Sequence, residues 1–221
     1  TNTVGSSITR LADHSVFIRA GPEIGVAATK TFSTQVATLL LFGVALGEAR
    51  ESLSRTARRR QLEAIDGLPG QLQAMLDARA VIDEIAAMAA SASNHVFIGR
   101  ALGLPVAQEG ALKLKEISYD HAEAFPAGEL KHGPLALVTP DTPVFAVVTG
   151  DDERAQKTLG NIKEVQARGA PVSAVTDGES DAAEIADETL MISDTSERAA
   201  PILANVQLQL FSYHLAYELG R

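Results

Sequence analysis

Short runs rich in Val, Ile and Phe alternate along the chain with longer segments whose apolar residues recur every three or four positions. The short runs predict buried strands. These runs are residues 14–20, 95–99, 143–149, 171–176 and 188–193, with 135–138 as a weaker candidate. The clearest helical pattern covers residues 151–168 and ends before Gly169 and Pro171. Apolar strands that alternate with helices predict an α/β fold in which helices cover both faces of a parallel sheet.

The alternation stops between residues 48 and 93, where the apolar residues are spaced for helices. The Gly-Leu-Pro-Gly sequence at 67–70 predicts a break between helices in this connector. A second α/β unit begins near Asn94. The part before Glu48 has one predicted strand and one long helix, and one strand cannot form a sheet. Residues 1–50 therefore either pack on another chain or belong to a unit that has lost its N-terminal half.

The last predicted helix, residues 198–219, is apolar on almost every side. A helix of this kind is buried on two sides. Two arrangements fit equally well, namely a helix at a subunit interface and a helix clamped between the two halves of one chain.

Composition narrows the class of function. The chain has 221 residues, 46% of them hydrophobic, and its 19 Lys and Arg against 28 Asp and Glu give a net charge of −9. One or two domains with a sizeable core are expected, and nucleic acid is a poor partner for so acidic a chain. The absence of Cys excludes disulfides and thiolate sites and fits a cytosolic protein.

Neither a membrane segment nor a leader is predicted. The longest apolar run, residues 36–47, is too short to span a bilayer and predicts a buried core helix. No signal-peptide pattern opens the chain. Because the chain starts with Thr1 rather than Met, we expect a piece of a longer protein.

Glu109, Lys113 and Glu116 are four and three residues apart, so a helix places them on one face. They follow strand 95–99 near the start of a helix, and parallel sheets bind ligands at the carboxyl ends of their strands. There the lysine could hold an anion or form a Schiff base, and a glutamate could move protons. On spacing alone, a solvated helix with salt links is the favoured interpretation.

Residues 121–134, which we predict to be a loop, contain two His, two Glu, two Gly and two Pro. His132 stands before Gly133 and Pro134, so its imidazole can point into a cleft and titrate near neutral pH. The His and carboxylate spacing fits no zinc pattern, and we expect no metal. The three isolated histidines are expected to be structural or solvated, and they are His14, His95 and His214.

The segment at residues 21–30 combines glycines and alanines, so a ligand or a second backbone can approach it closely. Packing of helices through small residues explains the pattern equally well. Its spacing matches neither a dinucleotide fingerprint nor a phosphate-cradling P-loop. Arg55, Arg58, Arg59 and Arg60 form a basic cluster that we expect to be a solvated face.

These segments together resemble the isomerase part of the glutamine–fructose-6-phosphate aminotransferases (isomerizing), the glucosamine-6-phosphate synthases, which is built of two sugar-isomerase (SIS) domains. The matching segments are GPEIGVAATKTF (21–32), EGALKLKEISY (109–119), HAEAF (121–125) and GELKHGPLAL (128–137). The resemblance implies a flavodoxin-like, doubly wound SIS fold with one partial and one complete SIS unit. The implied domains are the end of a first SIS domain (1–50), a helical connector (51–93) and a second SIS domain (94–221).

The resemblance also implies roles for single residues. Glu116 corresponds to the carboxylate that moves a proton between C1 and C2 of fructosimine 6-phosphate, and Lys113 to a lysine that handles protons near the imine. His132 corresponds to a histidine that assists ring opening in the site of the neighbouring subunit. Val26 and Ala28 match a loop that contacts the sugar, although the family has Ser at the position of Ala28.

The implied activity makes glucosamine 6-phosphate from fructose 6-phosphate and glutamine-derived ammonia, in a cytoplasmic homo-oligomer, without metal or organic cofactor. The family's phosphate-binding loops, its tail lysine and its glutaminase domain are missing from these residues. We therefore expect the chain as given not to turn over fructose 6-phosphate. Two alternatives are a regulatory SIS module that binds a phosphosugar and a related deglycase or isomerase of amino sugar phosphates. No nucleic-acid or membrane partner is expected.

Overall fold

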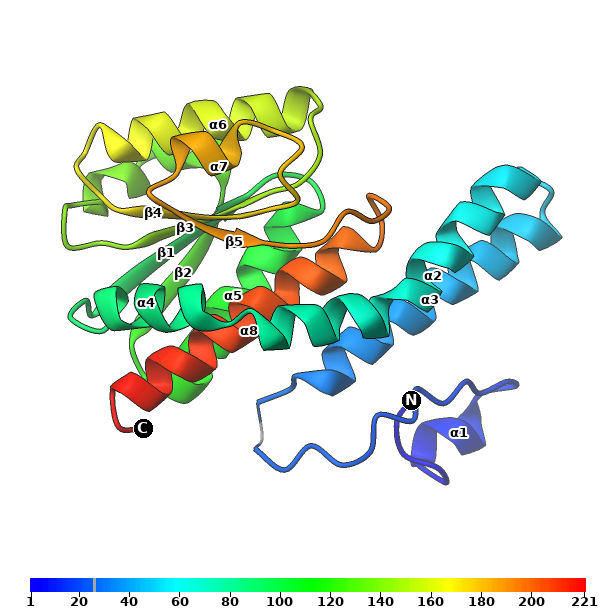
Figure 1. Cartoon of the computed structure of the whole chain (residues 1–221). Helices are drawn as coiled ribbons and strands as arrows, with labels where there is room; N and C mark the ends of the chain where they lie inside the picture. Colours follow the sequence, from blue (N-terminus) through cyan, green and yellow to red (C-terminus); the bar gives the residue numbers. More distant parts are fainter. Residues whose placement is uncertain (26) are drawn as a thin grey trace.

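A computed structural model describes residues 1–25 and 27–221 of the chain (Figure 1). At its centre lie five parallel strands in the order β2-β1-β3-β4-β5. The strands are β1 (Asn94–Gly99), β2 (His121–Pro126), β3 (Val144–Val148), β4 (Val172–Thr176) and β5 (Glu188–Met191). The predicted α/β fold with a parallel sheet is confirmed, and this strand order is the flavodoxin-like one.

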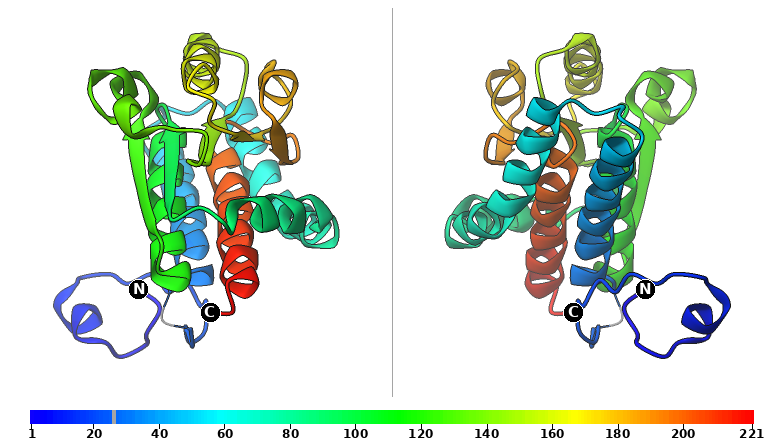
Figure 2. Two further views of the ribbon diagram at one scale, coloured as in Figure 1. Left: turned by 90° about the vertical axis from the view of Figure 1, so that its left-hand side faces the viewer. Right: turned by 90° about the vertical axis from the view of Figure 1, so that its right-hand side faces the viewer.

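Helices cover both faces of the sheet. In the described residues they are α1 (Ser7–Leu11), α2 (Lys30–Ala49), α3 (Arg55–Asp77), α4 (Ala80–Ala89), α5 (Gly103–Ser118), α6 (Glu153–Gln166), α7 (Ala182–Ile185) and α8 (Ala200–Glu218), with the 3-10 helices η1 (Ala127–His132) and η2 (Pro134–Leu137). Helices α4, α5 and α8 lie on one side of the sheet and α6 and α7 on the other (Figures 1 and 2).

Successive residues of the central strands enter two different core layers, because side chains alternate along a strand. Phe97 and Phe145 face α8, and the ring of Phe145 lies 4.2 Å from that of Phe211. Ile98 and Ala146 face the layer under α6. Both faces of these strands are therefore buried, which explains why their sequences are continuous apolar runs.

The connector is helical as predicted, but the predicted break inside it is wrong. Helix α3 runs through Pro69 without interruption. Proline removes one helical hydrogen bond, whereas Leu68 and Met75 on the same helix are buried in the main core. Packing of this apolar face on the core thus outweighs the local signal for a turn.

Three predictions about strands are also wrong. Residues 14–20 belong to no strand; Ile18 N–H donates only to the carbonyl of Thr1, and no described strand lies beside them to form a ladder. Residues 135–138 lie mainly in the 3-10 helix η2. Residues 121–126, predicted as part of a loop, form the edge strand β2.

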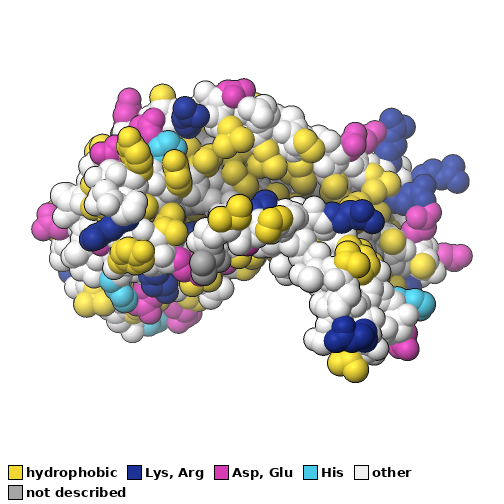
Figure 3. All heavy atoms as spheres, turned by 90° about the horizontal axis from the view of Figure 1, so that it is seen from below, with side chains coloured by type: hydrophobic (Ala, Val, Ile, Leu, Met, Phe, Trp, Pro, Cys, Tyr) yellow, Lys and Arg dark blue, Asp and Glu magenta, His cyan; other side chains and the backbone are white. Residues whose placement is uncertain are grey.

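Helix α2 is largely exposed, contrary to the prediction of a buried core helix. Among its residues only Val44 is buried, and Leu39 and Phe42 are 67% and 60% exposed. No described sheet from residues 1–50 covers it. By length and composition α2 could cross a bilayer. This is weak evidence for a membrane-spanning segment, because the core helices of soluble proteins and signal sequences meet the same criteria. Viewed from below, a band of apolar side chains crosses the middle of the molecule (Figure 3).

Helix α8 is buried on two sides within this chain. It packs against α5 on one side and α4 on another, and its buried residues include Leu208, Phe211 and Leu215. The arrangement clamped within one chain therefore accounts for most of its apolar surface. Tyr213 and Tyr217, however, are exposed.

Candidate active site

Lys113 lies between two carboxylates on α5. Its Nζ is 3.4 Å from Oε1 of Glu109 and is in closer contact with Oε2 of Glu116. The side chain of Lys113 is 3% exposed, against 12% for Glu109 and 37% for Glu116. The prediction that the three residues share one face is confirmed. The favoured interpretation as a solvated helix is wrong, because the amine is enclosed.

Small residues allow this enclosure. Gly110 faces Leu208 of α8 so closely that an added Cβ would meet the Cδ1 of the leucine at 2.5 Å. Helix α8 can therefore lie directly on α5, one helical turn before Lys113. Burial raises the pKa of Glu109, and the neighbouring Lys113 offsets only part of that effect. A carboxyl that binds its proton more readily than usual is suited to acid–base work near neutral pH.

The three residues do not lie where the sequence placed them. Helix α5 starts just after the carboxyl end of β1 and returns along the sheet, so Glu116 lies about 20 Å from its start at 1.5 Å per residue. Strand β2 begins only five residues later. Glu116 is therefore near the amino edge of the sheet, and the predicted location at the ligand crevice of the carboxyl edge is wrong.

His132 lies at the other edge. It ends η1, which follows the carboxyl end of β2, and it is exposed. Because β2 runs from the amino edge to the carboxyl edge, one chain places His132 and Glu116 at opposite ends of its sheet. The two side chains therefore do not meet within a single chain.

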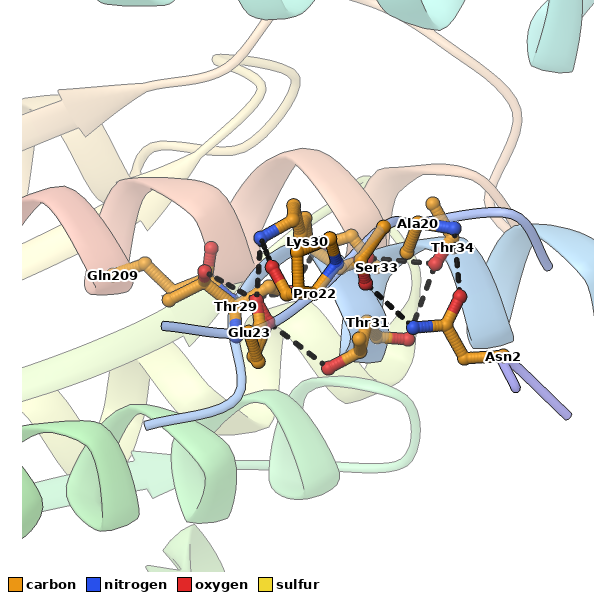
Figure 4. Close-up of polar contacts among 11 residues, drawn as sticks. Asn2, Ala20, Pro22, Glu23, Thr29, Lys30, Thr31, Ser33, Thr34 and Gln209 are labelled. Carbon is orange, nitrogen blue, oxygen red and sulfur yellow. Dashed lines mark hydrogen bonds and ion pairs between the residues drawn. The ribbon is translucent and has the colours of Figure 1, made fainter. Parts of the chain in front are cut away.

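The segment before α2 is organised by one carboxylate. Glu23 accepts hydrogen bonds from Lys30 and from the hydroxyl of Thr31, and its pKa lies below the ordinary value because these contacts and the Thr29 N–H outweigh its burial (Figure 4). Gln209 of α8 donates to the carbonyl of Thr29 at 3.4 Å. This contact seats the segment on α8.

Ala28 belongs to this segment and is half-buried. It precedes Thr29, whose partner Gln209 follows Leu208, the residue that packs on Gly110. The segment therefore lies against α8, next along that helix to the residue that contacts α5. Val26, the other predicted sugar-binding residue, lies outside the described residues.

The remaining sequence candidates play structural or surface roles. His95 is fully buried, His14 is exposed, and His214 pairs with Asp83 of α4 at 2.5 Å. In the basic cluster, Arg58 pairs with Glu48 and Arg59 with Glu63. Within residues 1–25 and 27–221, no group of three or more His, Cys, Asp or Glu side chains is placed to hold a metal ion.

Sequence reasoning missed two features near these residues. His121–Pro126 alternates exposed and buried side chains at its start, as an edge strand does, and that alternation was the available signal. A cleft at the carboxyl edge of β1 and β3 is lined by Arg100, Arg154 and Glu197, which no motif connects. These three residues come together only through the fold.

The chain is similar in sequence to known proteins over its whole length. The family model for the SIS domain matches residues 88–219. A glutamine–fructose-6-phosphate aminotransferase (isomerizing) from Halobacterium salinarum is 51% identical over 221 residues, which are 100% of this chain and 36% of that protein. The chain thus spans little more than a third of the length of the curated relatives it matches.

Two solved structures are similar over nearly the whole chain. The C-terminal domain of glucosamine-fructose-6-phosphate aminotransferase from Francisella tularensis has a TM-score of 0.92 and 39% identity, covering 99% of this chain and 62% of that one. Glucosamine-6-phosphate deaminase from Thermotoga maritima has a TM-score of 0.70 and 25% identity, covering 96% and 58%.

Proposed function

The chain belongs to the SIS domain family, and from that premise we propose that it is the isomerase part of a glutamine–fructose-6-phosphate aminotransferase. The full-length protein would convert fructose 6-phosphate and glutamine-derived ammonia into glucosamine 6-phosphate, as a cytoplasmic homodimer. The observation that carries the proposal is the enclosed Lys113 between Glu109 and Glu116. Residues 1–50, 51–93 and 94–221 would be the end of a first SIS domain, a connector and a second SIS domain.

The proposed chemistry is a proton transfer between adjacent carbons. Glu116 would take a proton from C1 of fructosimine 6-phosphate and return it to C2, while the proton of the C1 hydroxyl passes to the imine nitrogen, which leaves an aldehyde at C1 and an amine at C2. Glu116 is the most exposed of the three residues and can reach a substrate. Its contact with Lys113 holds the carboxylate beside the amine on the same face of α5.

His132 would act in the site of a neighbouring subunit. Its position at the far edge of the sheet from Glu116 supports this, since the two residues of one chain are separated by the length of β2. Ala28 and Val26 would lie beside the sugar. Ala28 lacks a hydroxyl, so any contact it makes to the sugar is apolar or through its backbone.

The test uses the full-length protein that contains these 221 residues. Glu116→Gln should lower kcat for glucosamine 6-phosphate formation about 10²–10⁴-fold, because the base of the proton transfer is lost. Lys157→Gln, on the exposed face of α6, is the matched control and should keep wild-type activity. Wild-type activity of Glu116→Gln would contradict the proposal. The 221-residue chain by itself should form no product.

A second candidate is the reverse class of reaction. The likeness to the Thermotoga maritima deaminase, at 25% identity, supports an enzyme that releases ammonia from glucosamine 6-phosphate. The same three residues of α5 would serve either direction. Incubating the full-length protein with glucosamine 6-phosphate alone and measuring ammonia separates the two, since a synthase should release little.

A further inference from the structure

A cavity of about 340 Å³ opens at the carboxyl edge of the sheet, between β1 and β3. At this point the chain changes the side on which it covers the sheet, because α5 follows β1 on one face and α6 follows β3 on the other. Open α/β sheets bind ligands at such a switch point. The starts of α5 and α6 and the segment before α8, which can be found in Figure 1, all contribute lining residues. The cavity lies at the opposite end of α5 from Glu116.

Two cations and two anions line this cavity. Arg154 lies 2.8 Å from Oε1 of Glu197 and also pairs with Asp152. Arg100 donates through Nη2 to Oδ1 of Asn161 at 3.1 Å, and its buried Nε has no partner among the described residues. The charges of the four lining residues sum to zero. A ligand that carries only negative charge would meet both carboxylates.

The helix ends offer little to an anion. Asp152 accepts the N–H groups of Arg154 and Ala155 at the start of α6. At the start of α5, Gly103 N–H bonds back to a carbonyl of its own turn, and Pro105 has no N–H. An anionic group in this cavity therefore depends on the arginines rather than on the helix ends.

The turn between β1 and α5 has a constrained backbone. Ala101, between β1 and α5, has φ of +46°, a left-handed conformation that non-glycine residues rarely adopt. A Cβ at Gly99 would meet the backbone of Gly103 at 2.4 Å. Strain of this kind persists where the surroundings enforce it, often at ligand sites.

Thr149, directly after β3, also lines the cavity. We propose that this cavity binds a zwitterionic amino sugar phosphate, with its phosphate against Arg100 and Thr149 and its ammonium against Glu197. The volume lies within the range of small-molecule sites, and a zwitterion satisfies both signs of charge at once. The proposal rests on the proposed function in one respect, since the product of that reaction is such a compound. The cavity would then be a product-sensing site, distinct from the cluster of Glu109, Lys113 and Glu116.

Calorimetry on the 221-residue chain tests this, with glucosamine 6-phosphate as the ligand. Glucose 6-phosphate lacks the ammonium and glucosamine lacks the phosphate, so each should bind at least about tenfold more weakly, the loss of one charge-assisted contact. Glu197→Gln should weaken glucosamine 6-phosphate binding about tenfold and leave glucose 6-phosphate binding unchanged. Lys157→Gln, one turn along α6 from Arg154, is the control variant and should bind glucosamine 6-phosphate as the wild type does.

Three results would overturn the inference. They are the absence of glucosamine 6-phosphate binding, equal binding of glucose 6-phosphate, and binding that Glu116→Gln abolishes while Glu197→Gln preserves it. Circular dichroism of each variant verifies that it is folded. None of these outcomes bears on turnover by the full-length protein, so the failure of this inference and the failure of the proposed function are told apart.

Discussion

Gly110 of α5 packs directly against Leu208 of α8. An added Cβ at Gly110 would lie 2.5 Å from Cδ1 and 3.0 Å from Cβ of the leucine. This contact lets the two helices approach closely, and it lies one turn before the enclosed Lys113. The closeness of α5 and α8 is therefore part of what builds the candidate site.

Gly110→Ala should destabilise the chain by about 1–2 kcal/mol, since overpacking outweighs the gain in helix propensity. Gly67→Ala is the matched control, because a Cβ there meets nothing within 4 Å. It should stabilise α3 by up to about 1 kcal/mol. Urea unfolding of both variants checks this. If both were stabilising, α5 and α8 would not be in the close contact described.

The stability of the chain should depend on the protonation of Glu109. Burial raises the pKa of its carboxyl above the ordinary 4.5, so the folded chain takes up this proton before the unfolded chain does. Its contribution is therefore favourable near pH 4.5 and is lost as the pH rises through the raised pKa. Relative to Glu109→Gln, the wild type should be more stable at about pH 5 than at pH 7. Urea unfolding at several pH values measures this difference in stability.

Relative to Glu153→Gln on α6, the wild type should show the opposite trend and be less stable at low pH than at pH 7. A hydrogen bond from Lys157 lowers the pKa of Glu153, so its contribution is present above the ordinary pKa and is lost as the pH falls. Parallel pH profiles for the wild type and Glu109→Gln would show that Glu109 is not buried as described.

His95 should make the chain sensitive to mild acid. Burial lowers the pKa of this fully enclosed imidazole below the ordinary 6.5, although nearby backbone carbonyls and Asp120 oppose the shift. The unfolded chain therefore binds the proton first, and stability is lost as the pH falls from about 6.5 towards the lowered pKa. His95→Leu should show a smaller loss between pH 7 and about pH 5.5 in chemical unfolding. An unchanged slope would contradict this assignment.

Activity should be recovered by mixing two inactive full-length variants. Glu116→Gln lacks the proposed base, and His132→Asn lacks the proposed ring-opening imidazole. If these residues meet across a two-fold interface, each mixed dimer keeps one intact site, and a 1:1 mixture should regain up to about a quarter of wild-type activity. The assay measures glucosamine 6-phosphate after subunit exchange. A mixture as inactive as its components would mean that His132 does not serve the neighbouring subunit.

Local pattern was sufficient to predict most of the sheet. The runs around Phe97, Phe145 and Val175 are apolar because both faces of these strands are buried, so their assignment needed no tertiary information. The edge strand β2 was missed because its outer side chains are polar, as in His121 and Glu123. The break predicted at Pro69 was wrong because the local sequence signals a turn, whereas burial of the neighbouring Leu68 keeps α3 continuous.

The candidate site was predictable only in part. Spacing of four and three residues placed Glu109, Lys113 and Glu116 on one face, because helix geometry fixes that relation. Their depth of burial depends on α8, almost 100 residues later in the chain, and no local pattern carries it. The same holds for the separation of Glu116 from His132, which follows from the direction of β2.

Helix α2 has a practical consequence for anyone who handles this chain alone. Its exposed leucines and Phe42 form an apolar surface that favours association between copies of the chain. Concentrated samples should therefore cluster, and mild detergent or low protein concentration should keep them dispersed. Light scattering across a dilution series would show whether the 221-residue chain is monomeric in solution.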